Sequence, residues 1–225
     1  MPLNWQPVEP PGRVTLEGEH VLLRPVDAAA DAESFFAATH APVADEDIWT
    51  YMFDGPYGSA AEMRQAMETA EGWSDPLFFT IVRRADGRPL GRAAYMRIEP
   101  QHGVIEIGAI LLAPELQRTT GATEAIYLLA RHAFDDLGYR RFEWKCDSQN
   151  AASRRAAERF GFTYEGTFRQ HMVIKDRNRD TAWFAITDDE WPRVKAAFET
   201  WLDPDNFDAD GKQRQPLGEL THFRP

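Results

Sequence analysis

Residues 104–138 restrict the possible folds of this chain more than any other segment. Residues 104–112 are apolar at almost every position, as in a strand that is covered on both faces of a sheet. After Pro114 the apolar residues recur at intervals of three and four, the spacing of a helix with one buried face, and Gly138 follows as a helix terminator. A buried strand that leads at once into an amphipathic helix predicts an α/β protein.

The remaining segments supply further strands and helices without an internal repeat or a long linker. Asp27 and Ser59 are suitable N-caps for two early helices, and turn residues at 85–89 and 176–180 separate pairs of strands. Strands are predicted at residues 20–26, 77–84, 90–98, 104–112, 140–147, 162–174 and 182–187. Helices are predicted at 27–38, from 59, between Pro114 and Gly138, at 150–160, and from Asp188 or Asp189 to 201. This order predicts one α/β domain with a mostly antiparallel sheet flanked by helices.

The predicted domain spans residues 14–202. Residues 1–13 are rich in proline and are expected to form an irregular arm. Residues 203–225 are polar and rich in turn residues, so they form either a loose appendage or a strap over the body.

The charge and composition of the chain exclude several classes of function. Twenty-five Lys and Arg against 36 Asp and Glu give a net charge of −11, which disfavours nucleic acid and suits an amine substrate. No stretch approaches the length of a membrane helix, and the Pro-rich N-terminus lacks the apolar core of a signal peptide, so we expect a cytoplasmic protein. The single cysteine, Cys146, lies in an apolar run and is expected to be a buried hydrophobe rather than a catalytic thiol.

The junction at residues 113–125 is the strongest candidate for a binding site. Small residues at a helix N-terminus let unpaired amide N–H groups approach an anion such as a pyrophosphate, although an ordinary capped helix has the same features. The pattern Gln117-x-x-Thr120-x-Ala122 resembles the acetyl-coenzyme A loop, Gln/Arg-x-x-Gly-x-Gly/Ala, of the GNAT acetyltransferases. Thr123-Glu124-Ala125 after it resembles the RimJ/RimL branch. Thr120 replaces the first glycine of the family pattern, and a glycine stands one position later at Gly121.

Three further motifs extend the resemblance over residues 14–201. Glu106-Ile107-Gly108 is similar to a motif of the family's fourth strand, and Asn150-x-x-Ser153 and Phe160-Gly161-Phe162 are similar to motifs around a later helix. The resemblance implies a twisted mixed sheet whose central strands splay apart and hold acetyl-coenzyme A between them. The residues implied in donor binding are Ile110, Leu111, Leu112, Gln117, Arg118, Thr119, Thr120, Gly121, Ala122, Thr123 and Asn150.

Glu106 and Ser153 are the implied catalytic residues. A partly buried carboxylate is a suitable base for an attacking amine, but a Glu in an apolar strand can equally be ion-paired or solvated. The resemblance gives Ser153 the role of partner to the departing thiolate and Asn150 a hydrogen bond to the pantetheine arm. Taken without the family, either residue could simply cap the helix that follows.

An aromatic segment, residues 48–57, corresponds in position to the acceptor-side loop of this branch. Aromatic walls suit an aliphatic amine or a peptide N-terminus, and packing beneath a helix is the alternative for each residue. The candidates are Trp49, Tyr51, Phe53 and Tyr57. The six histidines form no metal-ligand cluster and no Gly-x-Ser-x-Gly occurs, so neither a metal site nor a hydrolase triad is expected.

These features predict an enzyme, an N-acetyltransferase that moves acetyl from acetyl-coenzyme A to a primary amine by direct attack. The acceptor is a protein N-terminus or a small amine, and a homodimer is compatible with the sequence. One alternative is a coenzyme A-binding protein that has lost turnover, suggested by Thr120. Another is a transferase of longer acyl groups.

Overall fold

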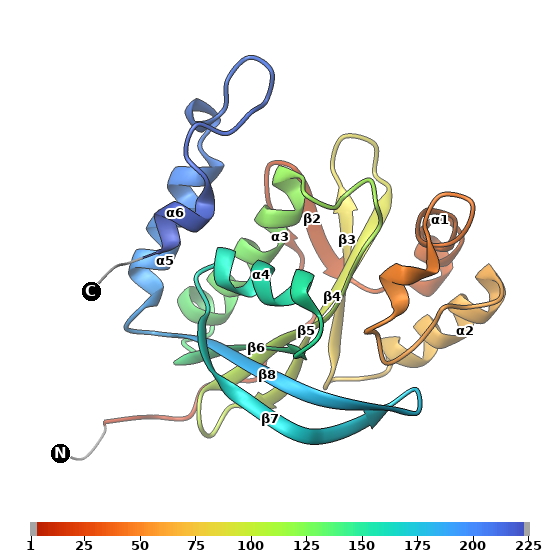
Figure 1. Ribbon diagram of the computed structural model, residues 1–225, viewed down its shortest axis with the longest axis horizontal. Helices are drawn as coiled ribbons and strands as arrows, with labels where there is room; N and C mark the ends of the chain where they lie inside the picture. Colours follow the sequence, from red (N-terminus) through yellow and green to blue (C-terminus); the bar gives the residue numbers. More distant parts are fainter. Residues whose placement is uncertain (1–3, 223–225) are drawn as a thin grey trace. The chain divides into compact units, whose positions relative to one another are not determined.

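The computed structural model describes residues 4–222, which form two compact units. The first unit contains residues 10–98 and 105–129, and the second contains residues 4–9, 99–104 and 130–222. Within the described residues the strand order is β1-β2-β3-β4-β5 in the first unit and β6-β8-β7 in the second (Figure 1). The fold is α/β with a mostly antiparallel sheet flanked by helices, so the predicted fold class is confirmed. The division into units does not coincide with the boundaries at residues 14 and 202, which stay predictions.

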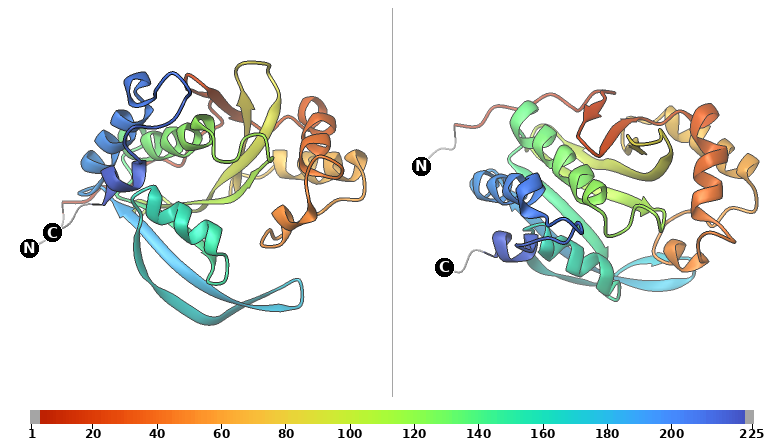
Figure 2. Two further views of the ribbon diagram at one scale, coloured as in Figure 1. Left: turned by 45° about the horizontal axis from the view of Figure 1, so that its top comes forward. Right: turned by 90° about the horizontal axis from the view of Figure 1, so that it is seen from above.

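The first unit begins with strands and helices close to those expected. Its elements are β1 (Leu16–Glu17), β2 (Val21–Pro25), α1 (Ala28–Thr39), the 3-10 turn η1 (Glu46–Trp49), α2 (Ala60–Glu71), β3 (Leu77–Arg83), β4 (Pro89–Glu99), β5 (Val104–Leu112) and α3 (Thr120–Arg131). Helices α1 and α2 pack side by side (Figure 2). Strands β3 and β4 form the predicted antiparallel hairpin, in which Thr80 pairs with Arg92.

Side-chain caps fix the starts of α1 and α2, as the sequence predicts. The Asp27 carboxylate accepts a hydrogen bond from Ala30 N at 3.0 Å, and Ser59 Oγ accepts one from Glu62 N at 3.2 Å. Glu62 reaches back to Gly58 N at 2.9 Å, one residue before the cap. Each cap satisfies amide groups that have no partner inside the helix, so these helix starts are determined locally.

The second unit holds the C-terminal half of the chain. Its elements are the π-helical turn η2 (His132–Asp136), β6 (Arg141–Asp147), α4 (Ala151–Arg159), β7 (Thr163–Ile174), β8 (Arg177–Thr187), α5 (Trp191–Leu202), the 3-10 turn η3 (Pro204–Asn206) and α6 (Leu217–Thr221). Strand β8 pairs antiparallel with both β6 and β7. Cys146 is buried in β6, as expected, and burial raises the pKa of its thiol.

Two local predictions in this unit are wrong. The turn between the last strands is shorter than residues 176–180, because Lys175 and Asp176 both adopt positive φ, at 48° and 59°, and β8 starts at Arg177. Neither Asp188 nor Asp189 caps α5. Glu190 is the N-cap residue, and its carboxylate instead accepts a hydrogen bond from Thr187 N at 2.8 Å.

Both ends of the described chain belong to the second unit. Residues 4–9 contain no helix or strand, and Trp5 Nε1 donates to Gln101 O at 2.9 Å. Beyond residue 202 the chain packs on the unit as a strap rather than trailing as a loose appendage. Helix α6 contacts α4 and α5, and Leu217 is fully buried.

Candidate active site

Glu106 lies in β5 with 4% of its side chain exposed. Its carboxylate pairs with the Nε of Arg97 on β4 at 2.6 Å, so the ion-paired state that the sequence left open is the one observed. Arg97 has a positive φ of 45°, and Asp75 accepts hydrogen bonds from the N–H groups of Arg97 and Ile98 at 3.0 and 3.1 Å. The partly exposed guanidinium of Arg97 therefore compensates the negative charge of the buried Glu106 carboxylate.

Two residues after Glu106, the strand β5 requires a glycine and then bends. A Cβ added to Gly108 would lie 2.6 Å from Met96 Sδ, so a larger residue would force the Met96 side chain to move. Ala109 adopts φ 50°, a left-handed conformation that is uncommon for alanine and interrupts the regular strand. The bend precedes Ile110, Leu111 and Leu112, the segment whose amides are predicted to contact the acetyl group.

The predicted pyrophosphate loop forms the start of α3. Gln117 Nε2 donates to Leu112 O at 3.0 Å, and Arg118 adopts φ 61°. Thr119 Oγ1 accepts from Ala122 N at 3.2 Å and so caps the helix that begins at Thr120. The first turn of a helix carries amide groups that favour an anion, and the role of these residues in donor binding stays a prediction.

Gly121 and Glu124 have structural reasons for their presence in this segment. A Cβ on Gly121 would lie 2.9 Å from Val21 Cγ1, so the glycine allows α3 to approach β2. The Glu124 carboxylate accepts three backbone hydrogen bonds, from Glu19, His20 and Val21, at 2.7, 2.8 and 2.9 Å. Glu124 therefore fastens the β1–β2 turn to α3.

Asn150 and Ser153 lie in the second unit, at the start of α4. Asn150 Oδ1 accepts from Ser153 N at 3.0 Å and caps the helix. Ser153 Oγ accepts from Trp144 Nε1 at 3.0 Å and is hydrogen-bonded to Cys146.

The four aromatic candidates of the segment 48–57 differ in position. Trp49 is fully buried, donates to Thr39 O at 3.0 Å and belongs to the core between α1 and α2, so its burial favours the packing role. Tyr51 and Phe53 are 39% and 47% exposed. Tyr57 lines a pocket of the first unit.

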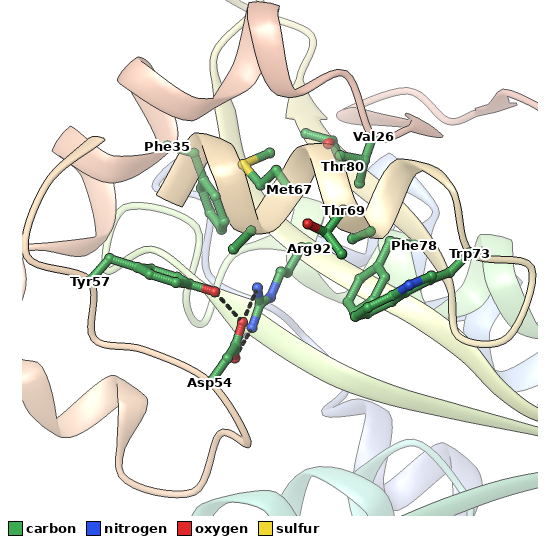
Figure 3. Close-up of a pocket in the computed structure, with 12 residues that line it drawn as sticks. Val26, Phe35, Asp54, Tyr57, Met67, Thr69, Trp73, Phe78, Thr80 and Arg92 are labelled. Atoms are coloured by element: carbon green, nitrogen blue, oxygen red, sulfur yellow. Dashed lines mark hydrogen bonds and ion pairs between the residues drawn. The ribbon is translucent and has the colours of Figure 1, made fainter. Parts of the chain in front are cut away.

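This pocket has a volume of about 270 Å³ and lies between α1, α2, β3 and β4 (Figure 3). Its walls are mainly apolar, and the figure shows their side chains around a guanidinium. Phe35, Met67, Trp73 and Phe78 are among its apolar lining residues.

The polar side of the pocket is a network of Arg92, Asp54 and Tyr57. The two terminal nitrogens of Arg92 bind Asp54 at 2.8 and 2.5 Å, and Tyr57 donates to the same carboxylate at 2.6 Å. Burial would raise the pKa of Asp54, but the charge and hydrogen bonds of Arg92 outweigh burial and hold it below its ordinary value. Burial and the bond to Asp54 raise the pKa of Tyr57 to about 12.

Sequence reasoning missed Arg92, Asp54, Trp73 and Phe78 as pocket residues. Arg92 carried a usable signal, since an arginine in an otherwise apolar strand raises the same question of charge compensation as Glu106. Asp54 stood within the aromatic segment but showed no pattern that set it apart. No sequence pattern distinguished Trp73 or Phe78.

The comparisons identify the family. A model of the acetyltransferase (GNAT) domain matches residues 20–163, and the chain belongs to this family. A GCN5-related N-acetyltransferase from Brucella melitensis is similar in structure, with 47% identity, a TM-score of 0.94, and coverage of 98% of this chain and 99% of that one. A probable GNAT-family acetyltransferase from Chromobacterium violaceum has 39% identity and a TM-score of 0.78, over 85% of this chain and 96% of that one.

A curated relative matches over a shorter part. Mycothiol acetyltransferase from Pseudarthrobacter chlorophenolicus is 29% identical over 132 residues, which are 54% of this chain and 40% of that protein. The chain thus spans less than half the length of that relative. Within residues 4–222, no group of three His, Cys, Asp or Glu side chains is placed to hold a metal ion. The helices of the same residues include none with the length and hydropathy of a membrane span.

Proposed function

We propose that this protein is an N-acetyltransferase of the RimJ/RimL-like branch that transfers acetyl from acetyl-coenzyme A to a primary amine. The observation that supports it most is Glu106, a buried carboxylate at the family's motif position in β5, three residues before the bend at Ala109. The acceptor is a small amine or a protein N-terminus. The proposal includes a cytoplasmic location and an acetyltransferase domain over residues 14–202. A homodimer is compatible with it.

Glu106 acts as the base in the proposed reaction. An amine is protonated at neutral pH and must lose a proton before it attacks the acetyl carbonyl. Arg97 holds the Glu106 carboxylate at 2.6 Å, so the acceptor ammonium must compete with, or displace, a partly exposed guanidinium. Arg97 is thus a positioning residue for the base.

The donor is held by the start of α3 and by the segment after Ala109. Amides of Ile110, Leu111 and Leu112 contact the acetyl and pantetheine portion, and residues 117–123 hold the pyrophosphate. Asn150 contacts the pantetheine arm, and Ser153 donates its hydroxyl proton to the departing thiolate. Of the four aromatic residues predicted to bind the acceptor, Tyr57 lines the pocket and keeps that role in the proposal. Trp49 packs in the core beneath this segment.

A calorimetric titration of acetyl-coenzyme A, repeated with 3′-dephospho-coenzyme A, tests donor binding. We expect micromolar binding of the first. No binding at millimolar concentration would contradict the proposal. The base is tested by Glu106→Gln, which should lower kcat by about 100-fold or more while donor affinity stays unchanged. An unchanged rate would remove Glu106 from the mechanism.

A second candidate is a coenzyme A-binding protein of the same fold without efficient turnover. The cap on α3 favours this candidate, because the N–H of Ala122 donates to Thr119 Oγ1 and is therefore not free to bind the pyrophosphate. Donor binding without amine-stimulated thiol release over a broad amine panel would support this candidate.

A third alternative is a transferase of longer acyl groups. Competition between acetyl- and succinyl-coenzyme A tests whether a longer acyl group is the true donor.

A further inference from the structure

The pocket between α1 and α2 contains an unused hydrogen-bond donor. Both terminal nitrogens of Arg92 donate hydrogen bonds to Asp54, and the Arg92 side chain is only 11% exposed. Its Nε is buried and has no hydrogen-bond partner within residues 4–222. A buried N–H without a partner costs free energy, so a ligand oxygen that reaches Nε after a shift of the surrounding side chains would recover that loss.

The charge of the pocket is already balanced. Arg92 and Asp54 form a bidentate pair, and Tyr57 donates to the carboxylate. A second carboxylate would leave one uncompensated negative charge in a partly enclosed space, and a cation would find the Asp54 carboxylate occupied. The oxygen that suits Arg92 Nε is therefore uncharged, as in an amide or ester carbonyl.

The rest of the pocket suits an apolar group. Phe35, Met67, Trp73 and Phe78 line it, and its volume of about 270 Å³ is enough for an aromatic or branched side chain. Trp73 is 43% exposed and tilts 42° from the Phe78 ring at 6.2 Å. Figure 3 shows these rings on one side of Arg92 and Tyr57 on the other.

The pocket lies beside the segment of β5 that follows the bend at Ala109. Ala113 N donates to Leu90 O at 2.8 Å, which aligns the start of β4 with the end of β5. A Cβ on Gly91 would lie 2.9 Å from the Leu112 side chain. Leu111 packs in one core cluster with Phe35 and Met67, two residues of the pocket wall. The buried side chain of Leu111, which does not itself line the pocket, thus joins the pocket wall to the segment proposed to hold the acetyl group.

We propose that this pocket selects acceptor amines that carry an aromatic or branched apolar group together with a neutral carbonyl close to the amine. The apolar group fills the space between Phe35, Met67, Trp73 and Phe78. The carbonyl accepts a hydrogen bond from Arg92 Nε, and the amine points toward β5. The role as acceptor pocket rests on the proposed acetyltransferase function, whereas the binding preference itself does not.

Four amines separate the components of this preference. Phenylalaninamide has the aromatic group and the neutral carbonyl, phenethylamine lacks the carbonyl, phenylalanine carries a carboxylate, and spermidine has neither an aromatic group nor a carbonyl. Binding is measured by calorimetry on the full chain without donor. Turnover is measured separately by thiol release with acetyl-coenzyme A. We expect phenylalaninamide to bind about tenfold or more tightly than each of the others.

Two variants with a matched control place the binding in the pocket. Ala70→Leu adds bulk to the pocket wall on α2 and should weaken phenylalaninamide about tenfold. Ala61→Leu adds the same bulk to an exposed position of the same helix, outside the pocket lining, and should leave the affinity unchanged. Arg92→Lys keeps a positive charge opposite Asp54 but removes the Nε donor, so it should abolish the preference for phenylalaninamide over phenethylamine.

The outcomes distinguish this proposal from the acetyltransferase function. Selective phenylalaninamide binding that Ala70→Leu weakens supports the pocket, even if acetyl-coenzyme A fails to bind and the proposed function falls. Equal affinity for all four amines, or an affinity that Ala70→Leu leaves unchanged, overturns the pocket proposal. Acetyl-coenzyme A binding would be unaffected by that second result, so the proposed function would stand.

Discussion

Two arginine–aspartate pairs in the first unit show opposite patterns of burial. In the pair Arg24–Asp31 the carboxylate is fully buried and the guanidinium is 28% exposed. In the pair Arg92–Asp54 the guanidinium is 11% exposed and the carboxylate 38%. Both pairs are bidentate, so the charge contact itself does not distinguish them.

The difference lies in how completely each buried group is bonded. Besides both terminal nitrogens of Arg24, the Asp31 carboxylate accepts hydrogen bonds from Asp27 N at 3.2 Å and from Thr80 Oγ1 at 2.6 Å. Arg92 keeps one buried nitrogen without a partner among the described residues, beside a cavity. A fully bonded pair stabilises the fold, whereas an incompletely bonded one leaves capacity to recognise a ligand.

The largest effect is expected at the fully bonded pair. Asp31→Ala removes the buried carboxylate and leaves its donors unpaired, so the free energy of unfolding should fall by about 3–5 kcal/mol. Urea denaturation measures this loss. Glu33→Ala on the exposed side of α1 is the control and should change stability by no more than about 0.5 kcal/mol. Similar stability of the two variants would show that the bonding of Asp31 carries little weight.

Two buried glutamates of the first unit, Glu124 and Glu106, extend the comparison. Glu124→Gln weakens three backbone hydrogen bonds and should cost about 1.5–3 kcal/mol of unfolding free energy. Glu106→Gln should cost less, because its partner Arg97 is 43% exposed and can be solvated. Urea denaturation of both variants, with thiol release measured in parallel, tests whether stability and activity separate as expected. A larger loss of stability at Glu106 would contradict the comparison.

The sequence predicted those parts of the fold that depend on neighbouring residues. Asp27 and Ser59 were identified as caps because the groups they bind lie three residues away. Strand β5 was predicted with its observed bounds because its apolar run is interrupted only by Glu106 and Gly108. Arg92 and Asp54 are 38 residues apart, so no local pattern links them. The error at α5 has a different, local cause, since the N-cap residue is Glu190, one residue after Asp189, and its carboxylate is bound to Thr187 N.

The candidate site was predicted only as far as the motifs reached. Glu106, the start of α3, Asn150 and Ser153 followed from the resemblance, and their roles stay predictions. Trp49 and Tyr57 belong to the same aromatic segment, yet one is in the core and the other lines a pocket. Burial of an individual aromatic residue depends on tertiary packing that a short segment does not encode.

The incompletely bonded pair Arg92–Asp54 also depends on His40, because His40 binds the loop that contains Asp54 and Tyr57. The stability that His40 contributes should depend on pH. Its Nε2 accepts from Tyr57 N at 3.0 Å, and burial lowers its pKa, although a hydrogen bond to Phe36 O opposes the shift. Protonation therefore favours the unfolded chain, and stability should be complete above about pH 6.5 and decline as the pH falls through the pKa of the folded state.

Urea midpoints measured from pH 7.5 to 5 test this dependence. His40→Gln should be less stable at pH 7.5 but should show a flatter decline over the same range. An equally steep decline in the variant would assign the pH dependence to other groups.

The smallest effect is expected at a pair that water surrounds. Arg83 binds Asp86 on the surface of the β3–β4 turn, and this hydrogen bond lowers the pKa of Asp86 to about 2. Asp86→Asn should leave the urea midpoint unchanged within error at pH 7, because solvent replaces the lost contact. A clear decrease of the urea midpoint would mean that burial does not determine how much an arginine–aspartate pair contributes to stability.

The three hydrogen bonds of Glu124 also bear on the order of folding. They join residues 103 to 105 positions apart in the chain, so a very long loop must close before they form. We expect this contact to be absent from the folding transition state. Loss of the carboxylate should then accelerate unfolding and leave the refolding rate nearly unchanged, which makes Glu124 a determinant of how long the folded chain persists.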